Sequence, residues 1–346
     1  MSIGKAVKFY GVVTIIAING IAVHAQTAPN LQGQKFTVSD FGGALLKSIR
    51  EAWLVPFEKA TGAKVDVDTP NPRAKLKAQV ESGNVAWDVY TEDAAFIQQN
   101  CGVLFEKVDT SKFISAGIDK RFVTNECGVP TSIVVSVFAY NEDKFGKTPP
   151  KGWADFFDLK KYPGKRAIWN NPTSGVIEAA LLADGVPADK LYPLDLDRAF
   201  RKLDTIKSTI FWTPSPSGLT DALANGQVDL SLSYAGRAYA AAKTGTKINV
   251  VQDQQILSWD QYAVVKGSKH RGTAESFLQF IAQPEQQARL TELTSYATAN
   301  GKGHPKVDAL TERFLPIQAK AVFVNHDWWS RNFDAVNQRF VAWQSK

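Results

Sequence analysis

Asp260 is the residue of this 346-residue chain whose neighbours best suit the binding of a small cation. It lies beside Trp259 and close to Tyr262, and aromatic faces attract an ammonium group by about 0.5–2 kcal/mol each when that group is desolvated. The carboxylate supplies the opposite charge without which a buried ammonium is strongly penalised. The alternative is that Asp260 only forms bonds within a hinge. Arg237 offers the complementary chemistry, because a guanidinium can hold a carboxylate bidentately, unless it lies on the surface or packs between domains.

Other side chains with suitable chemistry follow predicted strands or begin predicted helices. Two hydroxyls near a helix amino terminus would suit an anionic group, and acidic residues after a strand would suit a cation. Tryptophans in such places are more often part of the core. The candidates that we expect to face a common cleft are Phe41, Glu92, Asp93, Trp169, Thr173, Ser174 and Trp329.

Patterns typical of catalysis or metal binding are missing from the sequence. Beyond residue 25 the histidines are His270, His304 and His326, at spacings that suit no helical metal pair, and there is no C-x-x-C. A phosphate-binding loop, G-x-G-x-x-G and G-x-S-x-G are also missing. We therefore expect no cofactor, no metal and no enzyme. Carboxylates are numerous and the sequence does not pair them, so an exported enzyme remains the competing class.

The first element able to position these residues is a βαβ unit. A strand at 36–38 precedes a glycine-bearing loop at 39–43 and a helix with apolar residues every three to four positions, which ends at Gly62. Pro56 is expected to bend its last turn, and a second strand covers 64–68. Open α/β sheets bind ligands at the carboxyl ends of their strands, where the loop lies.

The remaining chain alternates strand and helix signals, which favours an α/β architecture with largely parallel sheets. About 320 residues usually form two domains, and 44% hydrophobic content suffices for two cores. The chain is expected to cross between them at 128–132, before a β-branched run at 133–138, and to return at 259–265. Helices are predicted at 174–183, 196–206, 217–225 and 274–282.

Several segments resemble the periplasmic solute-binding proteins of ABC importers, in the group of the spermidine/putrescine-binding proteins. The pattern PF-x-x-x-T-G-x-K-V at 56–65 is followed by ESGN-x-x-WDV at 81–89. Later segments resemble the family in the same order: AYNEDKF at 139–145, WADFFDLKKYPGKRA at 153–167, SYAGR at 233–237 and SWDQYAVVKGS at 258–268.

The resemblance implies a two-lobe periplasmic binding protein fold with a ligand cleft between discontinuous lobes. Lobe 1 would comprise 26–131 and 260–300, and lobe 2 would comprise 132–259 and 301–346, with a third crossing near 300–303. The function implied is capture of a small aliphatic amine, polyamine first, for an ABC permease. Asp260, in a D-x-x-A-[IV] context, would meet an amino group, and Tyr234 would stack on the ligand chain unless it packs as a strand-end tyrosine.

Departures from the family pattern support a different ligand. No acid occupies 170–175, where polyamine binders carry an acidic pair, and Thr-Glu-Asp-Ala replaces the paired aromatics expected at 91–94. Arg237 could bind a carboxylate, which a diamine lacks. The alternative ligand is therefore a zwitterion, an ω-amino acid or an opine, using both Arg237 and Asp260. A binder that presents its ligand to a chemoreceptor would share this fold.

The first 25 residues resemble a secretory signal peptide, with two lysines, an apolar stretch and a small-residue cleavage site ending at Ala25. A membrane anchor is disfavoured by Asn19 and by the short apolar run. We expect a free periplasmic protein and a monomer. Its formal charge falls from +6 to +4 when the two lysines are removed, too mild for a nucleic-acid partner.

Cys101 and Cys127 are the only two cysteines. An even pair in an exported chain predicts one disulfide, and two buried free thiols are the alternative.

Overall fold

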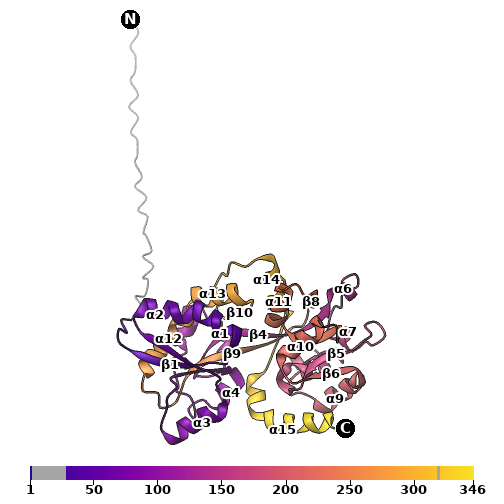
Figure 1. Ribbon diagram of the computed structural model, residues 1–346, viewed down its shortest axis with the longest axis horizontal. Helices are drawn as coiled ribbons and strands as arrows, with labels where there is room; N and C mark the ends of the chain where they lie inside the picture. Colours follow the sequence, from indigo (N-terminus) through magenta and orange to yellow (C-terminus); the bar gives the residue numbers. More distant parts are fainter. Residues whose placement is uncertain (2–28, 318–319) are drawn as a thin grey trace.

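The computed structural model describes residues 1, 29–317 and 320–346, so the predicted signal peptide lies almost entirely outside the described residues. Two α/β halves lie side by side (Figure 1). One sheet runs through both in the order β2-β1-β3-β9-β4-β7-β5-β6, with β8 and β10 also on β4 and β11 on β9. The strands are β1 (Lys35–Ser39), β2 (Lys64–Asp68), β3 (Val89–Asp93), β4 (Gly128–Asn141), β5 (Arg166–Trp169), β6 (Ile210–Thr213), β7 (Leu230–Tyr234), β8 (Ile248–Val250), β9 (Ile256–Val264), β10 (Ala297–Thr298) and β11 (Val322–Phe323).

Helices surround both halves (Figure 1). Those of the first half are α1 (Gly43–Ile49), α2 (Val55–Thr61), α3 (Arg73–Ser82), α4 (Ala94–Gln99), α5 (Ser111–Ala116), α12 (Arg271–Ile281) and α13 (Pro284–Thr294). The other helices are α6 (Glu142–Phe145), α7 (Trp153–Phe157), α8 (Val176–Ala183), α9 (Leu196–Asp204), α10 (Pro216–Ala224), α11 (Ala235–Lys243), α14 (Ala309–Phe314) and α15 (His326–Gln344). Short 3-10 turns cover Lys120–Phe122, Pro172–Ser174, Ala188–Lys190 and Lys207–Thr209. Within the described ranges, no helix has the length and apolar character needed to cross a membrane.

The predicted βαβ unit is present, but its helix has three parts. A π-helical turn, Arg50–Leu54, separates α1 from α2, and Pro56 follows it in the first turn of α2. Proline has no backbone N–H and clashes with the preceding turn, so the irregularity falls before Pro56 rather than after it. The helix ends, as predicted, at Gly62, whose φ of 77° is left-handed.

β4 and β9 connect the two halves. They pair antiparallel, and their register shifts between Pro130 and Ile133. On one side of this irregularity β9 pairs with β3, and on the other β4 pairs with β7. β10 pairs with β4 at residues 132–133, so a third segment meets the other two here. The segments at 128–132 and 259–265 belong to these paired strands, and β10 lies shortly before 300–303, while the crossings and the lobe boundaries stay a prediction.

Two large hydrophobic clusters fill the molecule. The first extends from the first half across the junction, and it contains Trp53 and Trp259. The second lies in the second half, where α15 contributes Trp329, Phe340 and Trp343. This packing agrees with the family resemblance, which implies that the C-terminal segment belongs with the second half.

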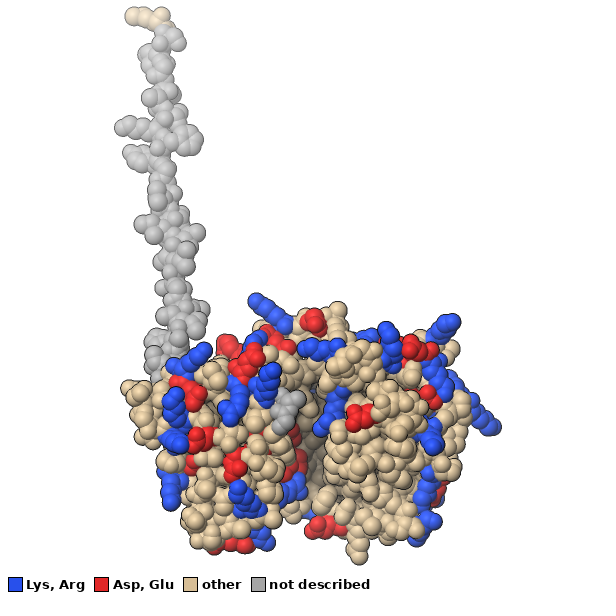
Figure 2. All heavy atoms as spheres, in the orientation of Figure 1, with Lys and Arg blue, Asp and Glu red and all other residues tan. Residues whose placement is uncertain are grey.

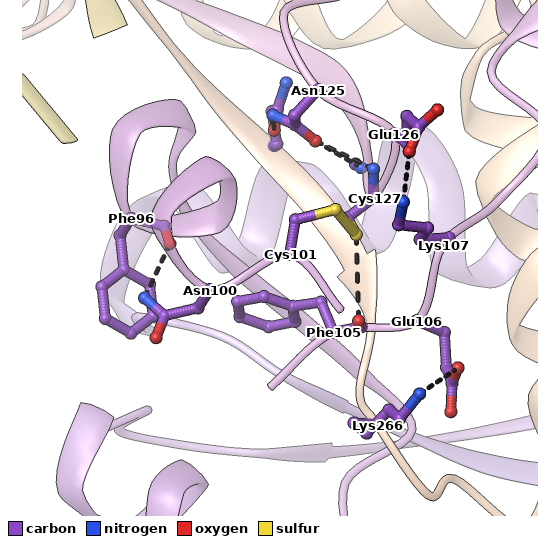
Figure 3. The surroundings of a disulfide bond; sticks show 12 residues. Phe96, Asn100, Cys101, Phe105, Glu106, Lys107, Asn125, Glu126, Cys127 and Lys266 are labelled. Carbon is purple, nitrogen blue, oxygen red and sulfur yellow. Dashed lines mark hydrogen bonds and ion pairs between the residues drawn. A yellow bond between two sulfur atoms is a disulfide. The ribbon is translucent and has the colours of Figure 1, made fainter. Parts of the chain in front are cut away.

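Cys101 and Cys127 form the predicted disulfide, with Cα atoms 5.6 Å apart (Figure 3). The side chain of Asn125 supports the second cysteine, because its Oδ1 accepts hydrogen bonds from the backbone N–H of Cys127 and of Gly128 (2.9 and 3.1 Å). The disulfide therefore connects the turn that follows α4 to the residue immediately before β4.

Candidate ligand-binding cleft

A cavity of about 100 Å³ lies between the two halves, and the molecular surface is hollowed there (Figure 2). One wall comes from α3, β3 and α4, and the other from the segment after β5 and from α15. A hydrogen bond from Gln98 to Asp327 (2.9 Å) joins α4 and α15 beside it. The lining includes Arg73, Asp93, Phe96, Asn171, Thr173 and Trp329.

Acidic side chains gather where β3 ends and β9 crosses between the halves. The antiparallel register places Asp93 directly opposite Asp260, and Glu92 precedes Asp93 on the same strand. Arg73 donates to both β3 acids, from Nε to Glu92 (2.9 Å) and from Nη2 to Asp93 (2.8 Å). Asp93 also caps α4 by accepting from the backbone N–H of Phe96.

Asp260 is the acid of this group whose side chain has no ion pair among the described residues. Burial raises its pKa well above the usual value, and the charges of Glu92, Asp93 and Asp40 raise it further. An uncompensated, half-buried carboxylate is costly, and a bound cation would relieve that cost. Asp260 does not itself line the cavity, but it stands directly opposite Asp93, which does, and its role in binding stays a prediction.

The other residues predicted around Asp260 have different surroundings. The hydroxyl of Tyr262 donates to the buried Asp40 (2.8 Å), which also accepts from the backbone of Gly42, and burial raises the pKa of Asp40. Trp259 is 2% exposed and packs edge-on against Phe122 (5.2 Å between ring centres). Both aromatic rings stabilise the junction, and neither lines the cavity.

Phe41, in the loop between β1 and α1, is 45% exposed, a large apolar side chain at the surface. The sequence places it on the first half, and the structure gives it no place in the cavity lining.

A second cluster is built at the end of β7. Tyr234 ends the strand, and the ring of Trp169, at the end of β5, lies edge-on to it (6.3 Å between centres). Burial raises the pKa of both Tyr234 and Tyr296, the charge of Asp260 raises both further, and the charge of Arg237 lowers both. The charges of Asp260 and Arg237 thus both reach these two tyrosines, although neither Tyr234 nor Arg237 is among the residues that line the cavity.

Arg237 lies in the first turn of α11 and is exposed, with no ion pair among the described residues. A positive charge at a helix amino terminus opposes the helix dipole, so this position does not favour arginine for the stability of the helix. The position is compatible both with a ligand contact and with a surface arginine, so the role of Arg237 stays a prediction.

Tyr296 was missed in the sequence. It follows Ser295, whose φ of 63° is left-handed, and its ring lies against Gly236. A Cβ on Gly236 would stand 2.9 Å from Cε2 of Tyr296, so only glycine permits this approach. The contact joins segments 60 positions apart, and no local pattern reveals it.

Of the two hydroxyl residues predicted to hold an anionic group, one lines the cavity and the other does not. Thr173 lines the cavity, and its hydroxyl donates to Asn171 (2.8 Å). Ser174 is fully buried, and its hydroxyl has no partner. The predicted helix at 174–183 starts later, at Val176, because Gly175 adopts a left-handed φ of 87°.

Trp329 lines the cavity from α15, although it is 3% exposed. Its Nε1 donates to Glu178 (2.9 Å), which also accepts from the hydroxyl of Tyr192 (2.7 Å). Burial raises the pKa of Glu178. The orientation of the indole is therefore fixed by its hydrogen bond to the buried Glu178. In the parts of the chain that the structure describes, no cluster of three or more His, Cys, Asp or Glu could hold a metal ion.

Known proteins share this architecture. The model of the bacterial extracellular solute-binding protein family matches residues 52–307. The chain is 33% identical to the gamma-aminobutyric acid-binding protein of Pseudomonas aeruginosa over 96% of each chain. It is 25% identical to the putrescine-binding periplasmic protein SpuD of that species, over 85% of this chain and 86% of that protein.

A solved structure, that of the Atu4243-GABA receptor, superposes with a TM-score of 0.82 at 36% identity and covers 90% of this chain and 98% of that one. This likeness confirms the predicted periplasmic binding protein fold. With a family model over most of its length and relatives along nearly all of it, the chain belongs to the bacterial extracellular solute-binding proteins, the substrate-binding components of ABC transporters, and is not an enzyme.

Proposed function

We propose that the cleft binds a short ω-amino acid such as 4-aminobutyrate, with its ammonium on Asp260 and its carboxylate on Arg237. The observation that supports this most is the pair itself. Asp260 and Arg237 carry opposite charges, and neither is in an ion pair among the described residues. Arg237 follows Gly236, against which the ring of Tyr296 lies, and both charges shift the pKa of Tyr234 and Tyr296. A zwitterion would satisfy both, and the tyrosine rings would cover the alkyl chain between them. The likeness to a gamma-aminobutyric acid-binding protein supports the same ligand.

A polyamine is the second candidate, and the sequence resemblance ranks it first. The acids at the junction and the likeness to a putrescine-binding protein favour it. Against it, the segment 170–175 offers Asn171 and Thr173 to the cavity and no acid for a second ammonium. Arg237 would also repel a dication.

The protein would act in the periplasm as a monomer, after removal of residues 1–25, and deliver its ligand to an ABC permease. Ligand contacts to Asp260 at the junction and to Arg237 on α11 would favour closure of the two halves, because a ligand stabilises the conformation that it binds best. The other predicted contacts, from Tyr234, Trp169, Thr173 and Trp329, would complete the cleft wall.

A thermal-shift screen of the purified protein lacking residues 1–25 tests the ligand class. The panel contains 4-aminobutyrate, α-amino acids, opines, putrescine and spermidine. We expect the largest shift with an ω-amino acid, since a ligand at 100 times its dissociation constant adds about 2.7 kcal/mol of stability. Stabilisation by the polyamines alone would make the zwitterion proposal wrong.

A further inference from the structure

Arg73 places a positively charged guanidinium in the wall of the cleft. It begins α3 in the first half, and its guanidinium reaches Glu92 and Asp93 at 2.9 and 2.8 Å. The same guanidinium lies over the ring of Phe96, 4.2 Å from its centre. Arg73, Asp93 and Phe96 all line the cavity between the halves.

The partners of Arg73 are those that an alkylammonium ion needs. Two carboxylates supply the opposite charge, and an aromatic face covers the cation. Asp93 stands directly opposite Asp260 in the β3–β9 register, and directly opposite residues of an antiparallel pair have Cβ atoms about 4.5–5.5 Å apart. The position that Arg73 fills is therefore adjacent to the carboxylate proposed for the ligand's ammonium.

Building on the ω-amino acid ligand proposed above, we propose that Arg73 is a specificity-determining residue, which limits the ligand to one ammonium group by occupying the place of a second. When all three are ionised, Glu92, Asp93 and Asp260 carry three negative charges, and Arg73 with one ligand ammonium reduces the net charge to a single negative charge. If Arg73 were absent, a bound diamine would give the site the same net charge, because its second ammonium would replace the guanidinium. With Arg73 in place, the second ammonium of a diamine meets a like charge and finds its carboxylates already bonded.

Lys75 makes the same two kinds of interaction as Arg73, an ion pair and a cation–π contact, but outside the cleft. Lys75, two positions further along α3, pairs with Asp68 (2.7 Å) and lies 4.7 Å from the ring centre of Trp87. Its side chain is 51% exposed, against 47% for Arg73, but Asp68 and Trp87 line a separate surface hollow of the first half. Lys75→Gln thus removes a comparable ion pair and cation–π contact without touching the cleft.

The test compares the affinities of 4-aminobutyrate and putrescine by calorimetry in the wild type, Arg73→Gln, Arg73→Met and Lys75→Gln. Methionine keeps an apolar stem over Phe96, so it retains packing if the glutamine variant does not fold. The loss of Arg73 raises the pKa of Glu92, already raised by burial and by Asp93, so the titrations are done at mildly alkaline pH to keep this carboxylate ionised.

We expect the affinity for putrescine relative to 4-aminobutyrate to rise at least tenfold in both Arg73 variants and to stay unchanged in Lys75→Gln. An unchanged ratio in the folded Arg73 variants, or an equal rise in Lys75→Gln, would overturn the proposal. A wild type that already prefers putrescine would instead contradict the ω-amino acid function. If the wild type binds neither compound, a gain of putrescine binding on loss of Arg73 still decides the role of this residue.

Discussion

Asp93 and Asp260 face each other directly across the β3–β9 pair, at the place where the chain passes from one half of the molecule to the other. Like charges in directly opposite positions of a sheet destabilise it, by up to about 1 kcal/mol. Arg73 compensates Asp93 within the protein, while Asp260 has no such partner among the described residues. When Asp260 is ionised, the ligand-free protein therefore carries an unfavourable electrostatic interaction that a bound cation would remove.

Asp260→Asn is expected to lower the affinity for 4-aminobutyrate by about 1.5–3 kcal/mol, the range for a hydrogen bond to a charged group. The variant stays folded, because asparagine preserves the shape and removes the repulsion with Asp93. Titration calorimetry gives the affinity, and Asp253→Asn, at an exposed position, is the control. Unchanged affinity would remove Asp260 from the site.

Ligand binding is expected to release a proton as the pH falls toward the raised pKa of Asp260, since the ammonium binds the ionised carboxylate. Calorimetry in buffers of different ionisation enthalpy measures this release, which Asp260→Asn abolishes.

The stability of the ligand-free protein is also expected to depend on pH through Asp260. A raised pKa means that the folded state holds the proton more tightly, so this contribution to stability is present at low pH and lost as the pH rises from about 3.9 through the raised pKa. A wild type and variant with the same pH dependence would contradict both expectations.

Arg237→Lys is expected to weaken 4-aminobutyrate binding more than putrescine binding, because lysine keeps the charge but cannot form the bidentate pair with a carboxylate. Arg237→Ala should weaken 4-aminobutyrate further. Parallel titrations of the two ligands measure the difference, and melting temperatures control for folding. If the wild type binds only diamines and Arg237→Ala has no effect, Arg237 does not bind a ligand carboxylate.

Gly236→Ala is expected to lower ligand affinity several-fold by displacing the ring of Tyr296, while stability changes little. Alanine favours a helix over glycine by about 1 kcal/mol, and this gain offsets part of the clash. Gly272→Ala is a matched control at the second position of α12, where an added Cβ meets nothing within 4 Å. Equal affinities of the two variants would show that Tyr296 makes no ligand contact.

Loss of the Cys101–Cys127 disulfide is expected to lower the free energy of unfolding by about 3.5 kcal/mol on the chain-entropy model, for a sequence separation of 26 residues. Ligand affinity should remain, since neither cysteine lines the cavity. Denaturation of a double serine variant measures the loss. Thiol titration of the denatured, non-reduced wild type should find no free thiol, and two thiols would contradict the bond.

Features that depend on local sequence could be predicted, and features that depend on distant contacts could not. Apolar periodicity and the stop at Gly62 predicted the first βαβ unit, and the β-branched run after 128–132 predicted the junction. Arg73 could not be recognised from the sequence because the role proposed for it depends on its ion pairs with Glu92 and Asp93, which only the fold brings to it. Tyr296 depends in the same way on Gly236. The late start of α8 has a local cause, the left-handed Gly175, that a hydrophobic pattern does not register.

The junction also bears on how the molecule denatures. β4 and β9 are hydrogen-bonded to strands of both halves, so a single continuous sheet runs through the molecule. If one half unfolded, the inner strands of the other half would lose their hydrogen-bonded neighbours. The hydrophobic cluster that spans the junction would also become exposed to water. The two halves should therefore lose structure together, in a single cooperative transition, even if they move relative to each other in the closure proposed above.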